Sequence, residues 1–390
     1  MKFTMEEELI IKSLREFVED EVKPAAAELE KTNEFPMKLW KRCVELGFIG
    51  VSFTSEYGGM GMRGTMDKIV LEEIGKECPA LALAIDAHHL ATRQIYNFGS
   101  KAQKEKYLPD MAFGEVIGAV AATEAAGVIP CAEFQKMGTQ SEKGFIVNGT
   151  KIFCTNSSVA DVIVVCGVMG DNFCSVIVDG NSEGLQRGGT LVEHKMGMHG
   201  TGTGTVLFNN VLVPYENVLV PEDTNKIDPF LTSQCYLDIS AISLGIAESV
   251  FKKTKDYLNG RIRNGKPLSS LQAVAHELVD MKCKIELMRS ILYRTAGITD
   301  EGTPDPMMIH ITKATVPEMA CDVAEAAIKL HGGVGYMEAT GIAHYLRDAV
   351  CNTIGENPTN FHKEQIALQL GLPIETSMPL VPIIGDRNDY

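Results

Sequence analysis

Hydrophobic residues at the start of the chain recur with a helical period. Thr4 followed three residues later by Glu7 is a capping box, a pair that satisfies free backbone N–H groups at the beginning of a helix. The apolar residues that follow form one stripe: Ile10, Leu14, Phe17 and Val18. We therefore expect a helix that begins at Thr4, with further helices to about Phe113 in an all-α domain of residues 1–116.

The pattern changes between residues 117 and 225, where β-branched residues gather in short runs. Such runs occupy residues 145–147, 162–165, 175–178 and 206–208, and Asn148-Gly149 lies directly after the first of them. β-branched side chains favour extended backbone, and Asn-Gly is a preferred two-residue turn. The pattern predicts a middle domain built on a barrel-like β-sheet.

The helical period returns from residue 226 onward. Seven apolar residues repeat at steps of three and four, which predicts a long buried helix: Leu271, Val274, Leu278, Met281, Ile285, Met288 and Leu292. A second stripe contains Ile239, Ile242, Ile246 and Val250. Pro317 lies inside the next helical run, and we expect a kink there because proline removes a backbone hydrogen bond. These features predict a helical bundle over residues 226–372, followed by a tail at residues 373–390.

Composition and charge narrow the class of protein. With 390 residues, 45% of them hydrophobic, the chain is large enough for several packed domains. The net charge of −15 argues against nucleic-acid or anionic-membrane partners, because binding phosphates needs a basic excess. The ten cysteines show no Cys-x-x-Cys spacing, so we expect reduced thiols and no metal. The first residues are acidic and no apolar run could span a bilayer, so the expected location is the cytoplasm.

Residues with chemical potential gather near the C-terminus. A glycine cluster spans residues 330–336, Arg347-Asp348 follows it, and Gly355-Glu356-Asn357 comes next. Glycines allow close approach of a backbone to a flat or phosphorylated ligand. Glu356 stands in apolar surroundings that raise the pKa of a carboxyl, which makes it a candidate base. A lone Glu is more commonly a helix cap or an ion-paired acid.

The order of these motifs resembles the flavin-dependent acyl-CoA dehydrogenases, up to about Leu372. Tyr57-Gly58-Gly59 matches an early motif of that family, and Thr123-Glu124 matches its flavin-proximal segment. The segment from Asn148 to Asn156 is similar to Asn-Gly-x-Lys-x-Trp-Ile-Thr-Asn, and Arg261, Gly265 and Gln272 match a later element. The resemblance implies an α+β fold: an N-terminal helical domain, a middle β-domain and a C-terminal four-helix bundle.

The resemblance also implies a reaction and its residues. Glu356 would remove the α-proton of an acyl-CoA thioester while FAD accepts the β-hydride, and an electron-transferring flavoprotein would take the electrons. The residues that match FAD contacts of the family are Ala121, Thr123, Phe153, Thr155, Arg261, Gln272, Gly332 and Gly333. Because the family's equivalent of Arg261 reaches the cofactor of a neighbouring subunit, the implied assembly is a homotetramer.

Several positions depart from the family pattern. Residues 125–130 replace a Pro-Gly-Ala-Gly-Ser-Asp segment near the CoA path, and Tyr236 replaces an arginine near the CoA nucleotide. Gly355 replaces a tyrosine beside the base, which predicts a branched, cyclic or aromatic acyl group. Asp86, followed by His88 and His89, is a second candidate catalytic acid of the kind that ring-desaturating relatives use, although an ordinary hydrogen-bonded cluster is the commoner reading.

Three alternatives therefore stay open beside an acyl-CoA dehydrogenase. The same residues could serve an enoyl-CoA reductase or a ring 1,4-dehydrogenase. The altered CoA-side motifs are also typical of a catalytically silent member of the family that is kept as a binding subunit.

Overall fold

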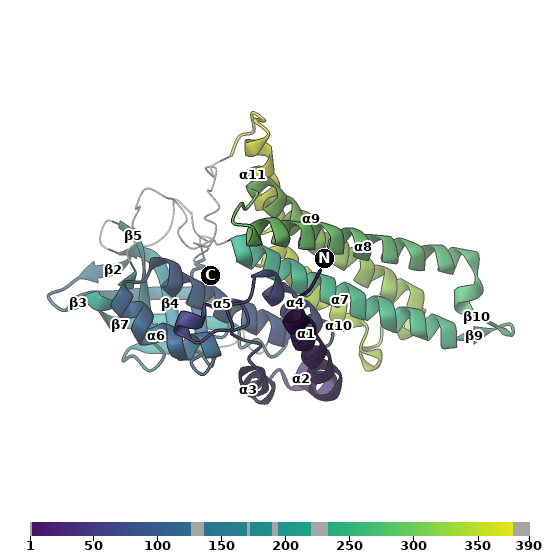
Figure 1. Cartoon of the computed structure of the whole chain (residues 1–390), viewed down its shortest axis with the longest axis horizontal. Coiled ribbons are helices and arrows are strands. Elements are labelled where there is room, and N and C mark those ends of the chain that lie inside the picture. Colours follow the sequence, from purple (N-terminus) through teal and green to yellow (C-terminus); the bar gives the residue numbers. More distant parts are fainter. Residues whose placement is uncertain (1, 126–135, 170–171, 189–193, 220–232, 377–390) are drawn as a thin grey trace.

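The structure is a computed structural model that describes residues 2–125, 136–169, 172–188, 194–219 and 233–376. Helices occupy both ends of the chain and strands the middle (Figure 1). The predicted order of a helical domain, a β-domain and a helical bundle is confirmed. Most of the predicted tail and residues 126–130 of the altered CoA-side segment lie outside the described residues.

The first domain is helical, as its apolar period predicts. Its helices are α1 (Met5–Phe17), α2 (Lys23–Thr32), α3 (Met37–Glu45), α4 (Thr65–Gly75), α5 (Pro79–Phe98) and α6 (Lys101–Phe113). Thr4 caps α1 through the predicted capping box, in which Thr4 Oγ1 accepts from the Glu7 N–H and the Glu7 carboxylate accepts from the Thr4 N–H. The buried face of α1 contains Ile11 rather than Ile10, so the predicted stripe begins one residue early.

The middle domain is one sheet with its own apolar core. Its strands are β1 (Gly118–Ala121), β2 (Lys136–Gln140), β3 (Gly144–Cys154), β4 (Val162–Met169), β5 (Asn172–Asp179), β6 (Leu185–Gly188), β7 (Gly204–Pro214) and β8 (Val218–Leu219). They lie in the order β6-β7-β3-β2-β4-β5-β8, and β1 pairs with β4 in parallel. Strands β1 and β2 both pair with β4, which brings the end of β1 close to β3.

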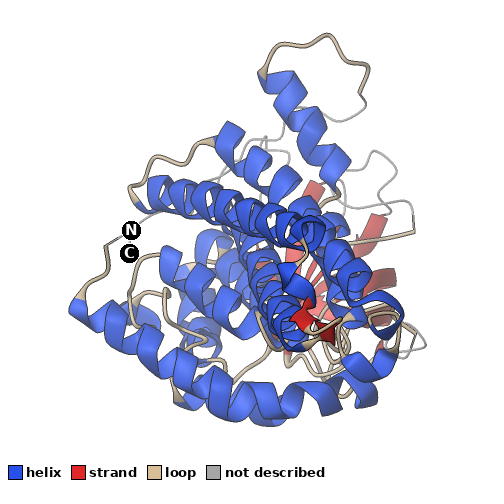
Figure 2. Cartoon of the chain, turned by 90° about the vertical axis from the view of Figure 1, so that its right-hand side faces the viewer, coloured by secondary structure: helices blue, strands red, loops and turns tan. Residues whose placement is uncertain are grey.

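The last part of the chain forms the bundle. Its helices are α7 (Ser233–Gly260), α8 (Gln272–Asp300), α9 (Pro306–His331), α10 (Ala343–Ile354) and α11 (Thr359–Gln369). A hairpin of β9 (Ile262–Arg263) and β10 (Lys266–Pro267) joins α7 to α8 at the tip of the bundle (Figure 1). Viewed from this tip, the sheet lies behind the helices (Figure 2).

Two predictions about the bundle helices differ in outcome. The predicted stripe of α7 is buried throughout, from Ile239 to Val250. In α8 only the part from Met281 onward is buried, and Leu271 is 50% exposed. The beginning of α8 extends with the hairpin away from the rest of the molecule, so the prediction of a fully buried helix is wrong there (Figure 1). Helix α9 runs continuously through Pro317.

Helix α5 joins the sheet to the bundle. Its Ala91 belongs to the core that contains Val164 of β4, whereas its Ile85 belongs to the core that contains Ile242 of α7. Burial of such aliphatic side chains contributes about 1.5–3 kcal/mol each. Asp86 follows Ile85 directly, so this joint places a carboxyl between the two bodies.

The described residues include nine cysteines, and all of them are free thiols. Among the helices that the structure describes, none has both the length and the apolar character to cross a membrane.

Candidate active site

The predicted base lies in the short connection between α10 and α11. Glu356 and Asn357 both have left-handed backbone, with φ angles of 51° and 68°. This conformation costs a residue other than glycine roughly 1–2 kcal/mol. Gly355 before them is extended, with φ −63° and ψ 155°, which any residue adopts. The two strained residues must therefore be held by their surroundings.

Helices α9 and α11 hold this connection through its carbonyl groups. Lys313 of α9 donates from Nζ to the carbonyl oxygens of Asn352 at 2.9 Å and Asn357 at 3.1 Å. His362 of α11 lies with Nε2 3.3 Å from the carbonyl oxygen of Glu356. Lys313 and His362 are both buried, so these bonds are shielded from water.

The Glu356 carboxyl is in surroundings that suit a base. Burial raises the pKa of Glu356 above its usual value, and the negative charge of Asp238 acts in the same direction. Lys313 and a hydrogen bond with Cys235 lower this pKa, but they do not cancel the effect of burial. Within the described residues Glu356 makes no ion pair and caps no helix, so neither of the commoner readings of a lone Glu applies. A raised carboxyl pKa brings a base closer to the operating pH.

Asp86 is a second buried carboxyl that interacts electrostatically with the first. It is 1% exposed, and neither of its oxygens has a hydrogen-bond partner among the described residues. Burial raises the pKa of Asp86 well above its usual value, and the charges of Asp238 and Glu356 add to the rise. The reading of Asp86 as a member of a hydrogen-bonded cluster is therefore wrong.

The two histidines after Asp86 bond elsewhere. His88 contacts the carbonyl oxygen of Met111 at 2.8 Å through Nε2 and accepts from the Gly118 N–H at 2.9 Å through Nδ1. His89 lies 2.7 Å from the carbonyl oxygen of Ile49. Their role is structural, as the commoner reading of such histidines predicts.

A buried network of charges, which sequence patterns did not predict, lies beside the two candidate acids. Asp238 of α7 binds Lys68 of α4 at 2.8 Å and Arg93 of α5 at 2.6 Å, and Arg93 also binds Asp67 at 2.9 Å. Lys68 and Arg93 hold the pKa of Asp238 well below its usual range against the effect of burial. Asp238 is thus fixed as an anion, and it is no candidate base although it lies one turn from Cys235.

Four residues predicted to contact FAD lie together at one end of the sheet: Ala121, Thr123, Phe153 and Thr155. The Ile152 N–H donates to the carbonyl oxygen of Thr123 at 2.9 Å, which ties the end of β3 to the segment after β1. The Phe153 side chain is 61% exposed and its φ is 55°. An exposed aromatic ring held by an unusual backbone offers a stacking surface for a flat ligand. Thr155 Oγ1 lies 3.3 Å from Thr203 Oγ1.

The next residue links this edge to α5. Asn156 Nδ2 donates to the carbonyl oxygens of Ala84 at 2.8 Å and Gly118 at 3.1 Å. Ala84 lies two residues before Asp86. One region of the molecule therefore contains the edge of the sheet around Phe153 and the buried carboxyl of Asp86. Glu356 belongs to the same region, because its charge acts on Asp86.

The other predicted FAD contacts lie at the tip of the bundle. Arg261 and Gln272 are exposed on either side of the hairpin, and Gly332-Gly333 is exposed at the end of α9. The rings of Tyr257 and His331 stack at 4.3 Å, which holds these ends of α7 and α9 together. Because α7 has 28 residues, its two ends are about 40 Å apart at a rise of about 1.5 Å per residue. One chain does not bring the two groups of predicted contacts together.

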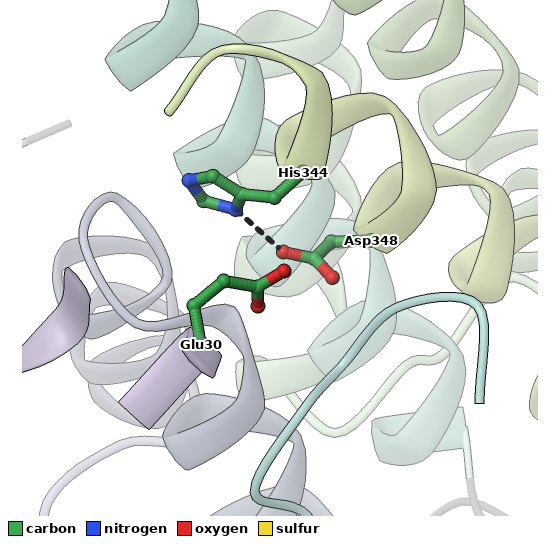
Figure 3. Close-up of side chains that lie close together, drawn as sticks. All are labelled: Glu30, His344 and Asp348. Carbon is green, nitrogen blue, oxygen red and sulfur yellow. Dashed lines mark hydrogen bonds and ion pairs between the residues drawn. The ribbon is translucent and has the colours of Figure 1, made fainter. Parts of the chain in front are cut away.

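A third group of side chains has the composition of a metal site. Glu30, His344 and Asp348 lie with their ligand atoms within 4.8 Å of one another (Figure 3). Their oxygens already have donors, however. Glu30 accepts from Arg347 at 2.7 Å, and Asp348 accepts from the Met198 N–H at 2.5 Å and contacts His344 at 3.1 Å. We read this cluster as a joint between the domains, in which Arg347 and Asp348 each bond to other residues rather than to one another.

Comparison with known families agrees with the motif order. The N-terminal domain of acyl-CoA dehydrogenase matches residues 4–115, the middle domain matches 119–211 and the C-terminal domain matches 237–371.

Individual relatives match over nearly their whole length. The acryloyl-CoA reductase (NADH) of Anaerotignum propionicum is 32% identical over 381 residues, which cover 94% of this chain and 95% of the relative. A short-chain-specific acyl-CoA dehydrogenase of Clostridium acetobutylicum is 32% identical over 371 residues, covering 92% and 96%. The butyryl-CoA dehydrogenase structure of Megasphaera elsdenii superimposes with a TM-score of 0.90 at 28% identity, covering 95% and 99%.

Proposed function

Because this chain belongs to the acyl-CoA dehydrogenase family, an FAD-dependent family of oxidoreductases, we propose that it desaturates an acyl-CoA thioester between its α- and β-carbons. Glu356 removes the α-proton. The observation that carries this assignment is a half-buried glutamate whose carboxyl has a raised pKa, in a strained connection that α9 and α11 hold. A base must lie within hydrogen-bond reach of the proton that it removes, and such a rigid backbone keeps its position constant.

The residues at the end of the sheet fit the flavin ring. Phe153 supplies the exposed aromatic face, the Ala121–Thr123 backbone supplies hydrogen-bonding groups, and the Thr155 hydroxyl is available beside it. FAD, when bound, accepts the hydrogen of the β-carbon together with its electron pair. Asp86 and Glu356 lie in the region that α5 shares with this edge, so base and ring can act on adjacent carbons.

The remaining FAD contacts require a second copy of the chain. Arg261, Gln272 and Gly332-Gly333 lie at the far tip of the bundle, where no contact with the stacking edge of the same chain is feasible. A guanidinium such as Arg261 suits a pyrophosphate through paired hydrogen bonds. We propose that each FAD is held by two chains, in a homotetramer that passes electrons to an electron-transferring flavoprotein.

Gly355 sets the size of the acyl group. A Cβ built at Gly355 meets only the carbonyl oxygen of Cys351, at the ordinary contact distance of 3.4 Å, and its φ of −63° suits any residue. Neither crowding nor conformation requires glycine there. The missing side chain leaves room beside the base, which supports a branched, cyclic or aromatic substrate.

Gly355→Tyr tests this assignment of specificity. We expect the variant to fold and to lose about tenfold in kcat/KM on cyclic or aromatic thioesters, with little change on linear ones, since excluding a few carbons from a pocket is worth about 1–3 kcal/mol. The measurement is steady-state kinetics on both substrate groups, with Gly355→Ala as the matched small variant. Equal losses on both groups would show that position 355 does not select the acyl group.

Asp86 supports a second candidate reaction. Its buried carboxyl has no hydrogen-bond partner among the described residues and senses the charge of Glu356. Two carboxyls near one acyl group could remove protons from two carbons, as a ring 1,4-dehydrogenase requires. The Anaerotignum propionicum relative is an acryloyl-CoA reductase, which supports the reverse, reductive direction as a further alternative.

The function is tested by anaerobic titration of the FAD-loaded protein with linear, branched, cyclic and aromatic acyl-CoA thioesters. We expect a yellow protein whose flavin absorbance bleaches with at least one thioester, and no bleaching with free CoA as the control. A colourless oligomer, or a yellow one that no thioester bleaches, would contradict dehydrogenation and favour a catalytically silent binding subunit.

A further inference from the structure

Two buried histidines lie behind the connection that carries Glu356. His310 of α9 and His362 of α11 are 1% and 0% exposed, and their Nδ1 atoms are 2.9 Å apart. On its other side, His362 Nε2 lies 3.3 Å from the carbonyl oxygen of Glu356. The two rings thus form a chain that runs from α9 through α11 to the backbone of the base.

The direction of both hydrogen bonds follows from the carbonyl oxygen of Glu356, because its role as an acceptor is certain. A carbonyl oxygen only accepts, so His362 Nε2 must carry the proton and donate to Glu356. Burial lowers the pKa of His362 to about 2 and that of His310 to about 4, so both rings are neutral near pH 7. A neutral His362 that is protonated on Nε2 has a bare Nδ1, which accepts from the Nδ1–H of His310.

The remaining nitrogen completes the assignment. His310 is then unprotonated at Nε2, a buried acceptor that has no hydrogen-bond partner among the described residues. The other groups that face the pair are the Lys313 ammonium, the Asn357 backbone, the Tyr236 ring and the Phe361 ring. Lys313 already donates to the carbonyl oxygens of Asn352 and Asn357. The faces of the two aromatic rings provide no alternative hydrogen-bond partner for His362 Nδ1.

The connection needs this support because of its sequence. The connection contains Glu356-Asn357, and both residues have left-handed backbone. Glycine adopts this conformation at no steric cost and asparagine at a small one, whereas glutamate is strained there. The Lys313 bonds hold Asn357, and Asn357 Nδ2 donates to Tyr236 at 3.2 Å. Among the described residues, only His362 directs a side-chain hydrogen bond at the carbonyl of the base itself.

We propose that His310 and His362 are positioning residues, a pair of fixed tautomers that holds the Glu356 backbone and thereby aims its carboxyl at the α-carbon. This proposal rests on the proposed function, with Glu356 as the base. Loss of the His362 donor frees the carbonyl, lets Glu356 leave the left-handed region and moves the carboxyl away from its working position. Displacement of a catalytic group by about 1 Å costs on the order of 10²-fold in rate.

Matched variants of His362 separate positioning from packing. His362→Phe keeps a ring but has no donor, whereas His362→Gln places an amide N–H near the Nε2 position. We expect His362→Phe to lower kcat per bound flavin by about 10–100-fold with KM changed less than about threefold, and His362→Gln to recover most of the loss. Because proton removal becomes slower, the isotope effect with α-deuterated thioester should rise in His362→Phe.

The outer histidine gives an independent and gentler test. His310→Leu removes the donor to His362, whereas His310→Asn keeps an N–H near Nδ1, and we expect the same order of activities in this pair. Equal kcat per bound flavin in wild type and His362→Phe would overturn the proposal, as would equal losses in His362→Phe and His362→Gln. If His362→Phe does not fold, the His310 pair decides by the same criterion. Retained activity in Glu356→Gln would instead overturn the proposed function itself.

Discussion

Replacing Glu356 by glutamine lowers turnover by about 10²–10⁴-fold, the usual contribution of a general base. The amide has the shape of the carboxyl but cannot accept the α-proton. FAD content should stay normal, because the predicted FAD contacts lie on the sheet and at the tip of the bundle. The measurement is single-turnover bleaching with the best thioester, and Glu325→Gln, at an exposed position of α9, is the matched control.

The same variant has a predicted effect on stability. Because the folded-state pKa of Glu356 is raised, its carboxyl contributes favourably to stability at pH values below its pKa in the unfolded state. This contribution is lost as the pH rises through the pKa in the folded state. Glu356→Gln should therefore be more stable than wild type at pH 8, and the difference should vanish near pH 4.

Turnover decides the role of Glu356 as the base. If Glu356→Gln kept more than about a tenth of wild-type turnover, another group would be the base.

Arg93→Met destabilises the protein by about 3–5 kcal/mol, the usual cost of removing one partner of a buried ion pair. Asp67 would lose its cation, and Asp238 would keep only Lys68. The free energy of unfolding can be followed in urea through Trp40, the only tryptophan of the chain, which is 1% exposed and donates to the Gly114 carbonyl at 2.9 Å.

Two further variants identify the cause of that loss. Adding Asp67→Asn to Arg93→Met removes one stranded charge and should recover part of the stability. Arg294→Met, at an exposed position of α8, should change it by less than about 0.5 kcal/mol. A loss below about 1 kcal/mol in Arg93→Met would mean that water reaches the network and screens its charges.

Local patterns in the sequence predicted those elements that local forces determine. The Thr4 capping box and the stripe of α7 depend on residues within a few positions of one another, so they are legible in one dimension. The exposed beginning of α8 could not be predicted in this way, because its apolar stripe is the same as that of a buried helix. Only the absence of neighbours in space distinguishes the two. The motifs likewise singled out Glu356 and Phe153, whose roles as base and as flavin contact stay predictions.

Contacts between segments that are distant in the chain could not be predicted from the sequence. Arg93 and Asp238 are 145 positions apart, and Lys313 and Asn357 are 44 apart. Neither pair has a local signature, and single buried charges look like surface charges in a sequence. That Asp86 has no hydrogen-bond partner among the described residues is equally invisible in the sequence, since it depends on all the elements that surround this carboxyl.

The connection between α10 and α11 contains three consecutive positions that differ in their freedom to vary. Position 355 has a common backbone conformation and open space, so mutation there could alter substrate preference in a lineage without endangering the architecture. Positions 356 and 357 have left-handed backbone, so most side chains would cost stability there, and a change at 356 would also remove the carboxyl. Related sequences should therefore differ at position 355 where their acyl substrates differ. Positions 356 and 357 should vary less.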